Sequence, residues 1–185
     1  MDHAQAALVS FLHSVADSQD RVAIGAFNTF LYPLARLGAS TGELTRSLTR
    51  IEEPETETSY TELYQAMNRQ LAEFAGNAGR KAVIVLSDGE DYPFAVHSGV
   101  EHPVWGEQVL APQEVIRRYR QEEVTLYAIS FADAAHPDLA RIARETGGEV
   151  FEAYDESDLS AVYTSIRESI RGEVRLRIRV PASPS

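Results

Sequence analysis

Short apolar runs alternate with amphipathic helical segments along most of this chain of 185 residues. Two runs rich in β-branched residues, 81–86 and 124–131, predict buried strands, and a shorter strand begins at residue 150. Each is followed by a segment with apolar residues at helical spacing. Repeated strand–helix units predict an α/β fold with a doubly wound, mostly parallel sheet that carries helices on both faces.

The first part of the chain has a different pattern. An amphipathic helix is predicted over 4–16, and a turn of two residues joins two apolar runs, 22–27 and 30–34. Strands joined by so short a turn are antiparallel, and Pro33 is tolerated only on an edge strand. We therefore expect an antiparallel hairpin at one edge of the sheet.

The remaining segments complete the expected order of elements. Thr41 is the predicted cap of a helix, a second helix runs from about Thr61 to Ala75, and 92–111 is a long irregular loop. Apolar residues alternate with arginines over 174–180, which predicts a strand with one solvated face. We expect one domain over 1–172, followed by an extra strand and a Pro/Ser tail over 173–185.

Composition narrows the possible partners. The hydrophobic fraction of 44% and the charged fraction of 24% are those of a soluble globular protein, and no apolar run is long enough to span a membrane. A formal charge of −11 argues against nucleic-acid binding, which needs clustered cations. With zero cysteines the chain has no disulfide, thiolate metal site or cysteine nucleophile.

Asp88 stands directly after the predicted strand 81–86, between Ser87 and Gly89. Ligands bind at the carboxyl ends of the strands in an open parallel sheet, so this carboxylate is placed to bind a hard cation. It could equally cap or turn the chain. Spacing alone leaves both interpretations open.

Several motifs in order resemble von Willebrand factor A domains, closest to the bacterial ones. The resemblance covers roughly residues 4–171 and rests on these segments: Asp20 to Ala23 before Phe27 and Asn28, Thr61 to Met67 ("Thr-x-Leu-Tyr-x-Ala-Leu"), Val85 to Asp91 ("leucine-Ser/Thr-Asp-Gly-Glu-Asp"), Val124 to Phe131, and Thr146 to Gly148. It implies a non-enzymatic adhesion or protein-binding module. By the habit of the family, it also suggests a bacterial cell envelope or exported protein.

The resemblance further implies that Thr61 and Asp88 belong to a metal-ion-dependent adhesion site. Mg²⁺, or Mn²⁺ or Ca²⁺ in its place, takes oxygen ligands and leaves a position open. A carboxylate of a protein partner would then complete the metal's shell.

Two departures from the family pattern change this expectation. The family's Asp-x-Ser-x-Ser motif, at the end of a first central strand, is absent, and the chain begins at the helix that follows it. We therefore expect that strand to be absent, metal binding to be weak or absent, and the exposed strands to promote self-association. In addition, Ser59 and Tyr60 stand where the family has two glycines, so Ser59 or Thr58 could substitute for Thr61, although the register of the following residues favours Thr61.

The loop after Asp88 offers further candidates. Tyr92 and Trp105 could contact a partner, as could Ser59. His97 and His102 suggest an alternative, a metal-dependent α/β hydrolase that uses Asp88 with these histidines. Against it, the chain has no Gly-x-Ser-x-Gly elbow and no phosphate-binding glycine-rich loop, and a zinc site would lack a third ligand at recognisable spacing.

Overall fold

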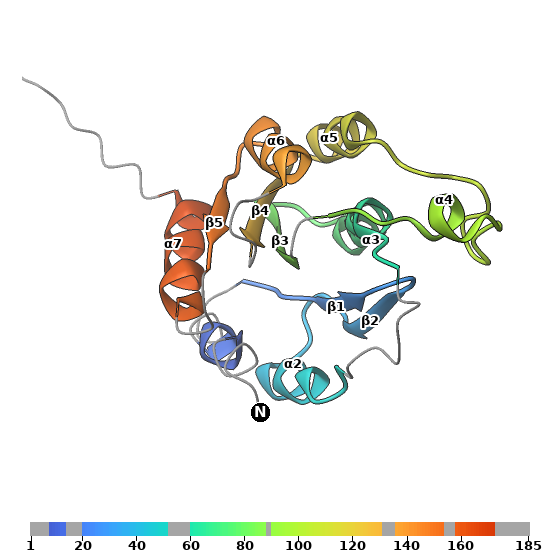
Figure 1. The fold of residues 1–185 in the computed structure, drawn as a ribbon. Coiled ribbons are helices and arrows are strands. Elements are labelled where there is room, and N and C mark those ends of the chain that lie inside the picture. The colour runs from blue at the N-terminus through green and yellow to red at the C-terminus, as the bar shows by residue number, and fades with distance from the viewer. Residues whose placement is uncertain are drawn as a thin grey trace, which may run out of the picture.

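The computed structural model describes residues 8–13, 20–51, 60–87, 90–130, 136–153 and 158–172. The strands of these residues form two sheets (Figure 1). One is an antiparallel hairpin of β1 (Ile24–Phe27) and β2 (Leu31–Ala35), in which Pro33 lies opposite Gly25. The predicted hairpin is confirmed.

The second sheet is parallel and has the order β3-β4-β5. Its strands are β3 (Lys81–Ser87), β4 (Val124–Ser130) and β5 (Val150–Glu152). β3 and β4 pair over their full length, from Lys81 opposite Val124 to Ser87 opposite Ser130. The side chains of β4 are buried on both faces, as the continuous apolar run predicts for a central strand.

Helices cover both faces of the parallel sheet (Figure 1). On one face lie α3 (Leu63–Gln70) with its 3₁₀ extension η1 (Leu71–Phe74), α5 (Pro112–Gln121) and α6 (Pro137–Glu145). On the other lies α7 (Leu159–Arg171), with apolar residues of the helical segment 8–13 beside it. This confirms the doubly wound α/β fold.

The hairpin packs against α2 (Thr41–Leu48) through a smaller apolar cluster that includes Leu12, Leu44 and Leu48. The predicted cap of this helix was wrong by one residue. Ser40 is the N-cap, because its hydroxyl accepts from the Glu43 backbone N–H while the Glu43 carboxylate accepts from the Ser40 backbone N–H.

The segment predicted as an irregular loop after β3 contains a short helix, α4 (Phe94–Ser98). Gly99 ends it with a left-handed φ of 73°, and a β-bridge between His102 and Gly106 closes the next turn. The helix is too short for a periodic pattern to reveal it. Residues 92–109 therefore form an ordered excursion from the sheet.

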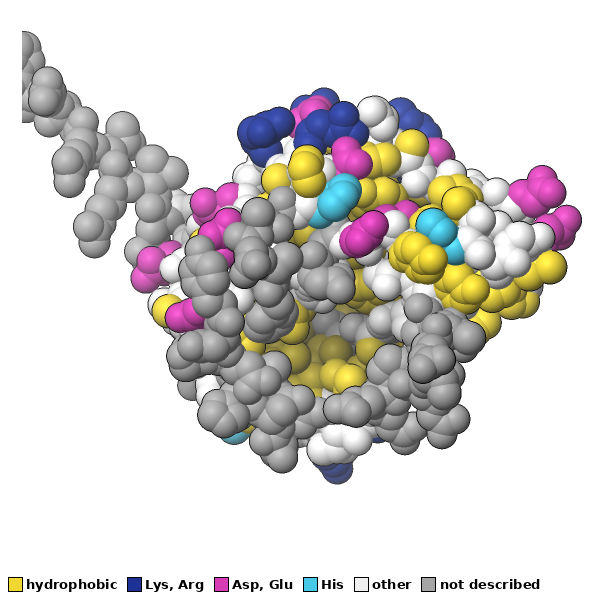
Figure 2. Space-filling view, viewed as in Figure 1, with side chains coloured by type: hydrophobic (Ala, Val, Ile, Leu, Met, Phe, Trp, Pro, Cys, Tyr) yellow, Lys and Arg dark blue, Asp and Glu magenta, His cyan; other side chains and the backbone are white. Residues whose placement is uncertain are grey.

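Among the described strands, β3 has a partner on one side only, and none lies between β3 and β1. Figure 2 shows hydrophobic side chains on the floor of a hollow in this part of the view. The absence of a first central strand from the protein stays a prediction. The predicted strand and tail over 173–185 lie outside the described residues. None of the described helices is both long and apolar enough to cross a membrane.

Candidate metal and ligand site

The segment after β3 folds back onto the start of α3. Thr61 and Tyr92 form an antiparallel bridge, in which the Thr61 N–H donates to the Tyr92 carbonyl at 3.0 Å and the Tyr92 N–H donates to the Thr61 carbonyl at 2.8 Å. Thr61 thus lies beside the loop that leaves the carboxyl end of β3, and α3 begins two residues later than predicted. Asp88 and Ser59, the other predicted site residues on these segments, lie outside the described residues.

Two carboxylates that the sequence analysis did not single out link these segments reciprocally. Asp91 Oδ1, from the loop, accepts a hydrogen bond from the Tyr64 N–H in the first turn of α3 at 3.1 Å. Glu62 Oε1, from the N-cap position of α3, accepts from the Phe94 N–H at 2.8 Å. Unpaired N–H groups and the helix dipole favour a negative charge at a helix start.

Burial changes the protonation of both groups. It raises the pKa of Glu62, whose side chain is almost fully buried, although the hydrogen bond from Phe94 opposes the change. Burial also raises the pKa of Asp91, to about 7; the Tyr64 N–H opposes this shift, and the nearby charge of Glu62 adds to it. Both carboxyl groups therefore lie in a poorly solvated edge of the sheet, where the charged form is disfavoured.

The turn of the β1–β2 hairpin binds the residues on both sides of Thr61 through hydrogen bonds. The Glu62 N–H donates to the Asn28 carbonyl at 2.9 Å, and the Tyr60 N–H donates to the Thr29 hydroxyl at 3.2 Å. His102, from the excursion, lies 2.8 Å from the Thr29 carbonyl through Nε2. Segments far apart in the sequence thus fix the position of Thr61.

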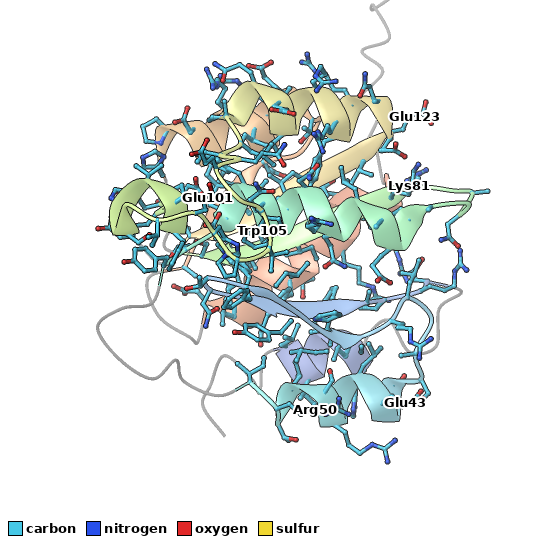
Figure 3. The ribbon with its side chains drawn as sticks, turned by 90° about the vertical axis from the view of Figure 1, so that its right-hand side faces the viewer. Glu43, Arg50, Lys81, Glu101, Trp105 and Glu123 are labelled. Atoms are coloured by element: carbon cyan, nitrogen blue, oxygen red, sulfur yellow. The ribbon has the colours of Figure 1, made fainter. Side chains whose placement is uncertain are left out.

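Tyr92 and Trp105 occupy different environments. The Tyr92 ring is 43% exposed and stacks on His97, with ring centroids 3.6 Å apart. Trp105 is half-buried and stacks on His102, with ring centroids 4.0 Å apart; Figure 3 shows it on the excursion that faces the viewer. Tyr92 is therefore the more accessible of the two to a partner.

The two loop histidines are held in separate contacts. His102 Nδ1 accepts from the backbone N–H groups of Val104 at 3.0 Å and Trp105 at 3.3 Å, so Nε2 carries the proton and donates to Thr29. Because both ring nitrogens of His102 have hydrogen-bond partners, neither is available to act as a base or a metal ligand. This argues against the metal-dependent hydrolase. Within the described ranges, no three His, Asp or Glu side chains are grouped as a metal site would require.

Oxygen donors at this edge suit a hard cation. Thr61 offers a hydroxyl, and Asp88 follows β3 by one residue in the sequence. Burial is the main cause of the raised pKa of Asp91, and the charge of Glu62 adds to it. Of the two predicted ligands, only Thr61 lies among the described residues, and a hydroxyl is an oxygen donor of the kind that Mg²⁺ accepts.

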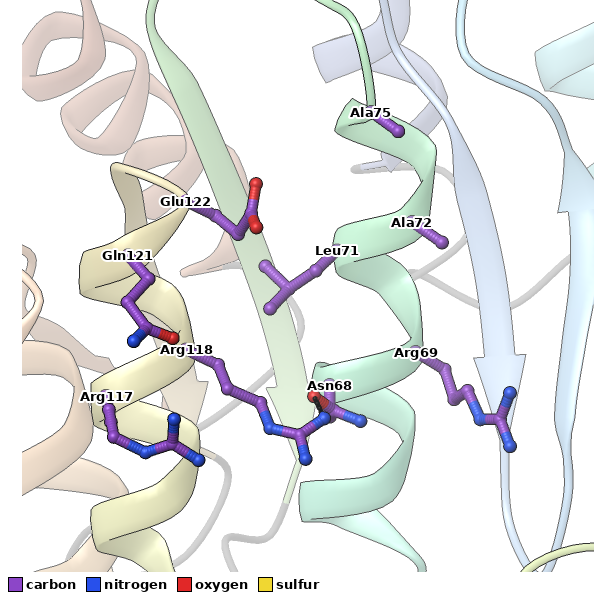
Figure 4. A pocket seen from close by; sticks show the side chains of 9 residues that line it. All are labelled: Asn68, Arg69, Leu71, Ala72, Ala75, Arg117, Arg118, Gln121 and Glu122. Atoms are coloured by element: carbon purple, nitrogen blue, oxygen red, sulfur yellow. Dashed lines mark hydrogen bonds between the residues drawn. The ribbon is translucent and has the colours of Figure 1, made fainter.

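A separate groove lies between η1 and α5, lined by Leu71, Ala72 and Ala75 on one side (Figure 4). Arg118 bridges the two helices there, donating to Asn68 Oδ1 at 2.7 Å and to Glu114 at 2.8 Å. The groove lies at the opposite end of α3 from Thr61. We regard it as a helix-packing joint.

A doubly wound sheet with polar groups at the carboxyl ends of its strands defines a class of α/β domains that bind ligands at this edge. A family model for the von Willebrand factor type A domain matches residues 1–165. The chain therefore belongs to the von Willebrand factor type A domain family, whose members are generally non-catalytic adhesion or protein-binding modules. No curated protein sequence matches it.

Solved structures share the fold at low identity. BatB from Bacteroides thetaiotaomicron has a TM-score of 0.66 at 12% identity, with 91% of this chain and 87% of that chain covered. The domain of the type V pili tip protein Mfa5 from Porphyromonas gingivalis has a TM-score of 0.64 at 14% identity, covering 96% and 90%. Proximal thread matrix protein 1 from the mussel byssus, described with a zinc-occupied metal-ion-dependent adhesion site, has a TM-score of 0.63 at 16% identity, covering 89% and 42%.

Proposed function

We propose that this domain binds a protein partner at the carboxyl end of β3, through a divalent cation held by Thr61 and Asp88. The observation that carries the proposal is the Thr61–Tyr92 bridge, which brings the loop after β3 against the residue predicted as a metal ligand. The adhesion site described for the mussel relative agrees with it.

The chemistry assigned to each group is simple. The Thr61 hydroxyl and the Asp88 carboxylate are oxygen ligands, and the partner supplies a further carboxylate. Asp91 and Glu62 each hold a backbone N–H, so they position the two segments and add negative potential. The cation would be Mg²⁺, Mn²⁺ or Ca²⁺. With two protein ligands we expect weak affinity, with a dissociation constant on the order of 10⁻³ M or weaker.

Metal titration of the ¹⁵N-labelled chain tests this proposal. Mg²⁺ should shift the amide resonances of Thr61, Glu62 and Tyr92, and paramagnetic Mn²⁺ should broaden the same resonances. Asp88→Ala should abolish both effects, and Thr61→Ala should weaken them.

The matched control is Glu122→Gln, which removes a carboxylate at the end of α5, away from Thr61. This variant should respond to metal as the parent does. Broadening centred elsewhere, or a response unchanged in Asp88→Ala, would overturn the proposed site. Tyr92→Ser should then weaken binding of any partner identified, without changing the metal titration.

A further inference from the structure

The excursion over 92–109 carries most of the exposed large hydrophobic side chains of the described residues. Five of their eight exposed large hydrophobic side chains lie on it. Besides Tyr92 these are Val96, Val100, Val104 and Val109, with exposed fractions of 58%, 60%, 59% and 42%. We call these four residues the valine surface. Exposed aliphatic residues concentrated in one segment are typical of an interaction site.

The valine surface is held by a fixed framework. His102 is 3% exposed, packs edge-on against Phe30 and Phe94, and stacks on Trp105. Its ring nitrogens bind the hairpin turn on one side and the backbone of its own loop on the other. Little conformational entropy is therefore lost when a partner covers the valines.

The charged side chains beside the valine surface in the sequence are negative. Residues 82–116 contain no lysine or arginine. Glu101 and Glu107, which lie between the valines in the sequence, are both exposed. A segment that covers this surface should therefore offer aliphatic side chains together with cations.

One segment of this chain has that chemistry. Over 174–180, four aliphatic residues alternate with Arg175, Arg177 and Arg179, and no acidic residue interrupts them. An extended chain places alternate side chains on opposite sides, so aliphatic groups could meet the valines while arginines reach the flanking glutamates. We propose that residues 174–180 of one copy of the chain dock on the valine surface of a second copy.

The whole segment can dock only on a second copy, because its first residue, Val174, follows Gly172 by two residues and so stays within about 7 Å of the end of α7. Arg80, next to the start of β3, donates to the Ile170 carbonyl at 2.7 Å, so α7 ends beside the start of β3. The excursion begins at the other end of this strand, roughly 20 Å away for a strand of this length. A single residue, Glu173, separates Gly172 from Val174, and Figure 1 shows α7 and α4 on opposite sides of the molecule. The contact is therefore head-to-tail.

Sedimentation velocity of the full chain in EDTA tests this inference independently of the metal site. The sedimentation coefficient should rise with protein concentration, and 0.5 M salt should reduce the effect, because a short-range electrostatic contact is screened. Two variants, V96S/V100S/V104S and R175E/R177E/R179E, should each weaken association by roughly tenfold or more. A labelled peptide with the sequence of residues 172–182 should bind the parent chain, and about tenfold more weakly the serine variant.

Controls separate this contact from folding and from other associations. Ile51→Ser removes an exposed apolar side chain outside the excursion and should leave association unchanged, as should Asp88→Ala. The substituted valines are more than half exposed, so the thermal midpoint should not move. Combining E101R/E107R with R175E/R177E/R179E should restore association. A chain that stays monomeric, or one that associates equally well in the serine variant, overturns the inference.

Discussion

Single residues decide how the edge around Thr61 is built. Glu62 and Asp91 each accept a backbone N–H from the other's segment, so the helix start and the loop after β3 are joined by side chains as well as by the Thr61–Tyr92 bridge. The sequence displayed both carboxylates, and Asp91 lay within the recognised motif. Their partners could not be predicted, because α3 and the loop meet only in the folded chain.

The protonation of Asp91 predicts a pH dependence of stability. Its pKa rises from 3.8 to about 7 on folding, so between these values the native state binds more protons than the unfolded state. The free energy of unfolding should therefore fall as pH rises from about 4 to 7, by on the order of 2–3 kcal/mol after allowance for solvent screening.

Asp91→Asn should remove most of this slope, because an amide does not titrate in this pH range. The fold should persist, because the amide oxygen can still accept a hydrogen bond from the Tyr64 N–H. Urea unfolding between pH 4 and 8 measures it, with Glu122→Gln as the control that keeps the slope. An unchanged slope in Asp91→Asn would contradict the assignment.

Replacing His102 by alanine should lower the free energy of unfolding strongly. His102 is buried and binds two loops through its ring nitrogens, so His102→Ala leaves a cavity and unpaired backbone groups. We expect a loss of about 2–4 kcal/mol in the free energy of unfolding. His97→Ala, which removes an exposed ring from the Tyr92 stack, should cost under about 1 kcal/mol. Equal losses would show that His102 is not the centre of the excursion.

At the level of elements, the sequence pattern predicted the strands, including the short ones of the hairpin and β5, and the long helices, but it missed the short helix α4. The strands β3 and β4 and the helices α5, α6 and α7 follow from runs of seven residues or more. α4 has five residues and lay in a segment of prolines, histidines and glycines. Its position depends on Gly99 and on the aromatic packing beneath the excursion, neither of which leaves a periodic signal.

The turn between α6 and β5 makes a prediction at this scale. A Cβ on Gly148 would overlap the Leu126 carbonyl of β4, so the backbone of this turn must approach the sheet closely. Gly148→Ala should cost about 2–4 kcal/mol of unfolding free energy, measured by chemical denaturation.

Gly42→Ala is the matched control for this prediction. It lies in α2 with no atom within 4 Å of an added Cβ, and it should stabilise the chain by roughly 0.5–1 kcal/mol. A neutral Gly148→Ala would show that the turn can move away from β4.

The whole molecule contains two sheets whose described strands do not pair with each other. α3 and η1 connect them, since Gln70 approaches Gly25 and Glu73 accepts from the Leu37 N–H. Within the part of the chain that is described, β3 and β1 each have one unpaired side. Such edges are sites of pairing with other chains.

Hydrogen exchange of the full chain tests this arrangement. β4 is paired on both sides, so its amides should exchange most slowly. Alternate amides over 82–86 in β3 should exchange much faster in dilute solution, and their protection should rise with concentration if copies pair through this edge. Uniform protection of β3 at the lowest concentration would mean that another strand already covers it.

The sequence by itself determined the fold class, the order of the main elements, the edge hairpin and the family, because these depend on local periodicity and on motifs of adjacent residues. Tertiary structure alone decided which groups meet at the carboxyl end of β3. Thr61 and Glu62 stand directly before α3, whereas Asp91 and His102 follow β3, and the hydrogen bonds between these two segments exist only once the sheet and α3 have packed. The burial that raises the pKa of Asp91 likewise depends on this packing, because a residue's solvent exposure is set by its neighbours in space.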